Sequence, residues 1–208
     1  MLLLILAPLF IIYSCGTGQE GTTATTSTSS STTTSSSTTT TTLPPPVLFV
    51  TPFTSSTDVF IRGQYSATHN GIDIFSSVEA EFRAVCGGTF TKEKFYNGVG
   101  RWQVNCTIQY DSNYVVMYAF EPFGAYHDEA PADTQYGMLI ANGTIVHSGE
   151  ALGRLLYRGD GAHIHFGITK SSSWECPMSY FTASASEEML VVFRRTETGS
   201  ICTDHNLH

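Results

Sequence analysis

A run of Ser and Thr over residues 22–42 most strongly limits what this chain can fold into. The run has almost no apolar side chains to bury, so it cannot offset the conformational entropy that folding would remove. Three prolines follow at positions 44–46 and favour a stiff, extended spacer. We therefore predict a disordered linker over residues 15–46 and a folded part over residues 47–208. That length is enough for one domain with its own hydrophobic core.

The first 14 residues are almost entirely apolar and are followed by Cys15. This stretch is shorter than a membrane span of about 20 residues but suits the hydrophobic region of an export signal. The run Ile12-Tyr13-Ser14-Cys15 resembles a bacterial lipobox, in which the cysteine is lipidated and becomes the new N-terminus. We therefore expect a cell-envelope protein anchored to a bacterial membrane through Cys15, in the periplasm or at the cell surface. A free cysteine after an ordinary signal peptide is the alternative.

The charge of the chain argues against one class of partner. The net charge is −8, and only 13% of the residues are charged. A protein that binds nucleic acid normally carries a basic stripe or patch, and this sequence has none. We therefore do not expect nucleic acid as a partner.

Four cysteines remain beyond Cys15, and their number suggests disulfides. They are Cys86, Cys106, Cys176 and Cys202. An even number in an exported chain indicates two disulfides, for which three pairings exist. Cys86 and Cys106 fall on strands that we predict to be neighbours, and Cys176 and Cys202 bracket the C-terminal segment, so we favour the pairs 86–106 and 176–202. A zinc site built on cysteines is disfavoured because the sequence has no C-x-x-C pair.

The folded part has the composition of an all-β domain. It is rich in Val, Ile, Phe, Tyr and Thr, with Gly and Asn at intervals, which favours antiparallel strands joined by turns. The pairs at 97–98 and 142–143 are both Asn-Gly and mark two of these turns. The predicted strands are residues 71–76, 82–86, 88–95, 102–110, 114–120, 144–146, 152–157 and 163–169.

Two further segments differ from this pattern. Residues 184–194 alone predict a helix, with Ser184 or Ser186 as the N-cap and Glu187-Glu188 in the first turn. Residues 122–137 contain two prolines and several acidic residues, which predicts a long loop. The expected fold is therefore an antiparallel β-sheet domain with a short C-terminal helix.

The triplet His163-Ile164-His165 is the first of two histidine clusters. Side chains at positions i and i+2 of a strand point to the same face, so both rings would project together, about 7 Å apart. Gly161 and Gly167 flank the cluster and allow other backbone to approach closely. Such a pair by itself is equally consistent with two surface histidines.

The second cluster is His69-Asn70-Gly71-Ile72-Asp73. Gly71 argues against a helix, so we expect a loop that runs into a strand holding Asp73, with His69 beside it. Alone, these are ordinary turn residues.

Together, the two clusters supply His, Asp and His, which is a complete set of protein ligands for a catalytic zinc with a fourth position open to water. The remaining histidine would lie one strand step from the metal, where a general base or acid is useful.

These motifs together resemble those of a known family. Residues 69–74 are similar to the H-x-G-x-D signature of the lysostaphin/LytM-type zinc metalloendopeptidases, and residues 161–166 resemble the H-x-H-F signature of the same family. Residues 84–89 are similar to its "A-x-x-x-G-x-V" strand turn, and residues 143–153 resemble its "G-x-x-V-x-x-G-x-x-I-G" segment. The resemblance spans about residues 66–170.

The resemblance implies a role for each residue of the two clusters. His69, Asp73 and His165 would bind Zn²⁺, and His163 would be a catalytic histidine beside the metal. The family cleaves peptide bonds in the cross-links of bacterial peptidoglycan, so peptidoglycan peptides would be the substrate. The chain has no H-E-x-x-H glutamate, so a histidine would have to transfer the proton.

The sequence departs from the family at one position. Family members usually carry a second catalytic histidine in a "Y-x-H" strand, and Phe120 aligns with that histidine here. The chain would then be a slow enzyme that relies on His163, or Glu121 or His127 would substitute, or the domain would bind zinc and cell wall without cleaving. The alignment also implies that Phe120→His would raise activity. A different possibility, outside this family, is a disulfide-stiffened surface binding module whose histidines are incidental.

Overall fold

The computed structural model describes residues 43–96, 102–122, 137–157 and 159–203. These residues fall within one compact unit, residues 42–208. Cys15, the predicted signal peptide and most of the predicted linker lie outside the described residues, as does His127. Within the described ranges, no helix combines the length and the apolar character that a membrane span requires.

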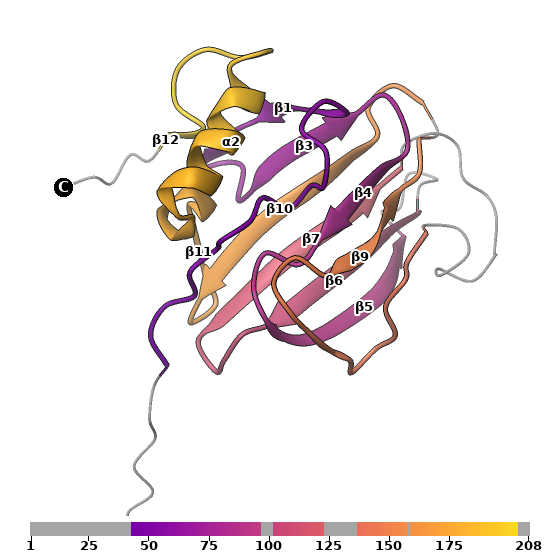
Figure 1. Ribbon diagram of the computed structural model, residues 1–208, viewed down its shortest axis with the longest axis vertical. Coiled ribbons are helices and arrows are strands. Elements are labelled where there is room, and N and C mark those ends of the chain that lie inside the picture. Colours follow the sequence, from indigo (N-terminus) through magenta and orange to yellow (C-terminus); the bar gives the residue numbers. More distant parts are fainter. Residues whose placement is uncertain (1–42, 97–101, 123–136, 158, 204–208) are drawn as a thin grey trace, which may run out of the picture. The chain divides into compact units, whose positions relative to one another are not determined.

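The domain is built around one antiparallel sheet of eight strands (Figure 1). Alternate residues of its central strands are buried, so one face packs into the core and the other remains open. The predicted all-β antiparallel fold is therefore confirmed. In spatial order the strands are β1 (Val59–Gly63), β3 (Ile72–Ser76), β10 (His163–Lys170), β7 (Tyr114–Glu121), β6 (Trp102–Gln109), β5 (Gly88–Tyr96) and β8 (Ile145–Val146), and β11 (Ser173–Glu175) pairs with β10.

A two-stranded sheet covers the core face of the large one. It consists of β4 (Ala80–Arg83) and β9 (Ala151–Leu155), which lie across β6 and β7 in Figure 1. Phe82 of β4 meets Phe120 of β7 edge to face, with ring centroids 5.9 Å apart. The hydroxyl of Tyr118 accepts a hydrogen bond from the Val85 amide and donates one to the Arg83 carbonyl. These contacts close the core on one side of the large sheet and leave its opposite face free for a site.

The helix α2 (Ala183–Phe193) packs against β1 at one edge of the sheet (Figure 1). Its N-cap is Thr182, whose side chain accepts a hydrogen bond from the Ala185 amide. The sequence placed the N-cap at Ser184 or Ser186, which is wrong because Thr182 already has extended backbone and caps the first turn. Glu187 and Glu188 consequently lie beyond that turn. The 3₁₀ helix η1 (Pro177–Tyr180) precedes α2.

Each predicted strand overlaps an observed one, and four short strands were missed. The missed strands are β1, β11, and the parallel pair β2 (Tyr65–Ser66) and β12 (Cys202–Thr203). Strands of two or three residues are too short to show any periodicity. In β1 the pairing register shifts between Ile61 and Gly63, and this bulge interrupts the alternation.

One of the two predicted disulfides is present. Cys176 and Cys202 are bonded and join the segment after β11 to β12. The predicted Cys86–Cys106 bond is wrong, because both thiols are free and buried. Cys86 follows β4, which belongs to the small sheet, whereas Cys106 lies on β6 in the middle of the large one. The two strands are not hydrogen-bonded neighbours, and the Cys106 thiol contacts the sulfur of Met138 instead, at 3.6 Å.

The two free thiols should be unreactive in the folded protein. Burial raises the pKa of both Cys86 and Cys106 to about 12, so almost no thiolate is present at pH 8. Alkylation by iodoacetamide, followed by peptide mapping, should be at least about 100-fold slower at these positions than for an exposed thiol. Both should react at the ordinary rate in denaturant. Fast labelling of the native protein, or a peptide linking Cys86 to Cys106, would contradict the structure.

Candidate metal centre

The two histidine clusters meet on the open face of the large sheet. Asp73 of β3 lies directly opposite His165 of β10, and Phe75 lies opposite His163. All four side chains are half-buried and alternate with buried neighbours, so they point to the same face. The predicted arrangement of His163 and His165 side by side on one strand face is therefore present.

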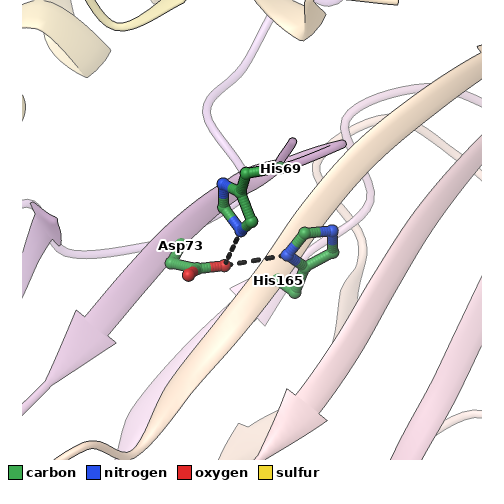
Figure 2. Close-up of side chains that lie close together, drawn as sticks. All are labelled: His69, Asp73 and His165. Atoms are coloured by element: carbon green, nitrogen blue, oxygen red, sulfur yellow. Dashed lines mark hydrogen bonds and ion pairs between the residues drawn. The ribbon is translucent and has the colours of Figure 1, made fainter. Parts of the chain in front are cut away.

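Three ligand atoms converge at this point (Figure 2). Oδ1 of Asp73 lies 2.8 Å from Nδ1 of His165 and 3.2 Å from Nε2 of His69, and all three atoms lie within 4.8 Å of one another. A tetrahedral zinc about 2.0–2.1 Å from each ligand requires ligand atoms roughly 3.4 Å apart. The three side chains therefore fit a zinc ion in both chemistry and spacing, with little movement.

A tight turn holds His69 in place. The backbone of His69 exchanges hydrogen bonds with that of Ser66, at 2.8 and 3.2 Å. The ring Nδ1 lies 2.7 Å from the carbonyl oxygen of Gln64. Because a carbonyl can only accept, Nδ1 carries the proton and Nε2 keeps its lone pair for a metal. His69 thus lies in a loop before β3, as the sequence predicted.

The carboxyl group of Asp73 is held in its charged form. Burial alone would raise its pKa, but the hydrogen bond from His165 and the nearby charges of His163, His69 and His165 outweigh burial and lower the pKa. A metal ligand must be deprotonated, so this environment favours the carboxylate that a cation would bind.

Two glycines make room for the ligands. A Cβ on Gly71 would lie 2.4 Å from Nε2 of His165, and a Cβ on Gly63 would lie 2.5 Å from Oδ2 of Asp73. Such distances are far inside van der Waals contact, so any side chain at either position would displace a ligand. The sequence showed Gly71 only as a residue that disfavours a helix. It did not indicate Gly63, because that glycine lies in the bulge of a strand that was not predicted.

His163 lies beside the three ligands with a partner on each side. Its Nδ1 donates a hydrogen bond to the Gly161 carbonyl at 2.7 Å, and its ring stacks on Phe75 with centroids 4.8 Å apart. Its Nε2 lies 3.7 Å from a carboxylate oxygen of Glu121, which stands opposite it on β7. These contacts fix the ring and leave Nε2 beside the Glu121 carboxylate, where it can exchange a proton.

The structure places Phe120 away from this face. Phe120 is fully buried, pairs with Ile164 across β7 and β10, and packs on Phe82 in the core. The alignment put Phe120 at the position of a catalytic histidine, but strand alternation turns Glu121 toward His163 instead. Among the described residues, the only histidines at the site are His163 and the two candidate ligands, and His147 is exposed on a turn after β8.

Comparisons with known proteins give matches among solved structures only. No family model matches the chain, and no curated protein matches it. The antimicrobial peptidase lysostaphin from Staphylococcus simulans is 17% identical, with a TM-score of 0.45 over 76% of this chain and 62% of that one. A zinc-containing peptidase from Vibrio cholerae is 16% identical, with a TM-score of 0.38 over 64% of this chain and 39% of that one. Csd3 from Helicobacter pylori is 19% identical, with a TM-score of 0.44 over 72% of this chain and 38% of that one.

These similar structures include lysostaphin, whose name the predicted family carries. This chain spans 38% of Csd3, 39% of the Vibrio cholerae peptidase and 62% of lysostaphin.

Replacement of Gly71 should weaken zinc binding specifically. In Gly71→Ala the new methyl group would collide with the His165 ring and turn Nδ1 away from Asp73. We expect the zinc dissociation constant to rise about 10- to 100-fold, as for other changes that misplace a ligand. Gly87→Ala is the matched control, since its nearest contact would be an ordinary 3.4 Å. Competition with a chelator measures both, and equal affinities for the two variants would contradict the close approach.

Proposed function

We propose that this protein is a zinc-dependent metalloendopeptidase that cleaves peptide cross-links of bacterial peptidoglycan. The observation that carries the proposal is the convergence of His69, Asp73 and His165 on one sheet face, with His163 beside them. The H-x-G-x-D and H-x-H-F motifs that supply these residues support the substrate class through their resemblance to the lysostaphin/LytM-type peptidases.

The residues of the site would have two separate roles, zinc binding and proton transfer. When bound, zinc would lower the pKa of water and polarise the scissile carbonyl. His69, Asp73 and His165 would hold the ion and leave one position open. His163 would accept a proton at Nε2 and deliver it to the leaving amine, while the Gly161 carbonyl keeps its ring oriented.

Glu121 supports His163 in this proposal. Its carboxylate lies 3.7 Å from Nε2 of His163, so it would stabilise the positive charge that the ring gains with a proton. A carboxylate in this place would take over from the second histidine, which the chain lacks at the aligned position 120.

The N-terminal features suggest where the enzyme works. We propose that it is exported, lipidated at Cys15 and held in the cell envelope. About thirty residues of flexible Ser/Thr-rich chain would allow the domain to reach peptidoglycan tens of ångströms from the membrane.

A second candidate function is a wall-binding or regulatory domain that keeps zinc but cleaves slowly or not at all. The observation in its favour is that His163 is the only histidine other than the ligands at the site, within the residues that the structure describes. Removal of His163 separates the two functions.

The His163→Ala variant should lose activity and keep its metal. The loss of a general base typically lowers the rate by a factor of about 10² to 10⁴. We expect this loss in the release of peptides from purified peptidoglycan, with one zinc per chain retained. His147→Ala, which alters an exposed ring outside the site, is the control. An inactive wild type with full zinc occupancy would favour the second candidate function.

The Phe120→His variant should not raise activity, although the family alignment implies that it would. The new ring would replace a fully buried phenyl group and leave polar nitrogens beside Phe82. We expect a loss of about 3 kcal/mol in the free energy of unfolding, measured by urea denaturation. Increased activity in Phe120→His would show that this position reaches the site.

The Glu121→Gln variant, by contrast, should lower activity about 10-fold or more without a comparable loss in the free energy of unfolding.

A further inference from the structure

A cavity of about 320 Å³ adjoins the metal centre on the side of β1 and β3. Its walls include Arg62 of β1, Phe75 of β3, and Tyr157 and Asp160 from the segment before β10. Phe75 stacks on His163, and Gly161, which also lines the cavity, accepts the hydrogen bond that orients the His163 ring. The cavity therefore opens beside the proposed catalytic residue.

The floor of the cavity is aromatic. The rings of Phe60 and Phe75 stack with centroids 5.7 Å apart, and Phe75 stacks in turn on His163 at 4.8 Å. These three rings form a continuous aromatic surface that leads from the two apolar phenyl rings to the proposed catalytic side chain. Such a surface packs well against the hydrocarbon part of a ligand.

The walls carry two opposite charges. The guanidinium of Arg62 lies 4.8 Å above the centroid of the Phe60 ring, a geometry that leaves its N–H groups available to an anion. Asp160 accepts a hydrogen bond from the Tyr157 hydroxyl at 2.7 Å, which holds its carboxylate in place. In the described part of the chain no ion pair joins Arg62 to Asp160, although both line the same cavity.

We propose that this cavity binds a zwitterionic amino-acid centre carried by the peptide substrate. Arg62 would bind the α-carboxylate, Asp160 would bind the α-ammonium, and the aromatic floor would pack against the carbon chain between that centre and the peptide. A ligand with both charges pairs with both Arg62 and Asp160, whereas a ligand with one charge leaves one of these two side chains without a partner.

The position of the cavity makes it a specificity site. A group held there is adjacent to His163, so the peptide bond that follows it would lie over the metal centre. The inference rests on the proposed function, because it names the kind of peptide that the same site selects. Cross-links with a free amino-acid centre next to the scissile bond should be preferred to cross-links in which that centre is blocked.

Binding of synthetic peptides tests the proposal without requiring turnover. The probes are branched peptides whose side chain ends in a free α-amino, α-carboxyl centre, and the same peptides with that carboxylate amidated or that amine acetylated. Titration calorimetry would use the zinc-loaded full-length chain with His163→Ala present in every variant. Arg62→Gln should raise the dissociation constant about 10-fold for the free peptide and less than twofold for the amidated one. Asp160→Asn should raise the dissociation constant about 10-fold for the free peptide and less than twofold for the acetylated one.

Two further variants sharpen the result. Arg62→Lys keeps the positive charge but lacks the planar guanidinium, so it should lose less affinity than Arg62→Gln, which separates lost charge from lost folding. Arg194→Gln is the matched control, because Arg194 is an exposed arginine at the C-cap of α2 that pairs with Glu187 and does not line the cavity. It should bind all of the peptides as the unaltered chain does.

The outcomes separate this inference from the proposed function. Three results would overturn the cavity assignment. They are equal affinity for the free and blocked peptides, no binding of either peptide, and equal losses of affinity for both peptides in Arg62→Gln. Charge-dependent binding by a protein that releases nothing from peptidoglycan would support the cavity and reject the peptidase. Cleavage that ignores the blocking groups would support the peptidase and reject the cavity.

Discussion

The pairing register of β3 with β10 is the constraint on which the site depends. It places Asp73 directly opposite His165, and their side chains meet because paired residues on adjacent strands point to the same face. A shift of one residue would turn Asp73 into the core and bring Ile72 or Ile74 to the open face. The buried residues of both strands prevent this shift, so the hydrophobic core that stabilises the fold also fixes the ligand geometry.

The site combines rigid strands with one loop that must approach closely. Asp73 and His165 are held by hydrogen-bonded neighbours on both sides, whereas His69 reaches them from a turn. That approach is possible only because Gly71 and Gly63 have no Cβ atoms where the ligands lie. The two glycines therefore matter for close packing against the ligands, so the metal site and the local packing cannot vary independently.

Strand alternation also decides which residue accompanies His163. Adjacent residues on β7 point to opposite faces of the sheet, since Phe120 is buried in the core and Glu121 faces the site. Motif alignment compares residues in order along the chain, and it carries no information on which face a strand presents. On the proposed function, a carboxylate and one histidine would provide the polar groups near the scissile bond, and the cavity lined by Arg62 and Asp160 would add selectivity at one edge.

The sequence by itself indicated the all-β class, the Cys176–Cys202 bond, and His69, Asp73, His163 and His165 as the candidate site, because strand periodicity, turn residues and ligand spacing are local properties of the chain. The tertiary structure alone decided the neighbours of each strand. It separated Cys86 from Cys106, turned Phe120 inward, brought Gly63 beneath Asp73 and opened the cavity next to His163. These features depend on contacts between segments distant in sequence, whose geometry is set by core packing and sheet order, and no local pattern encodes them.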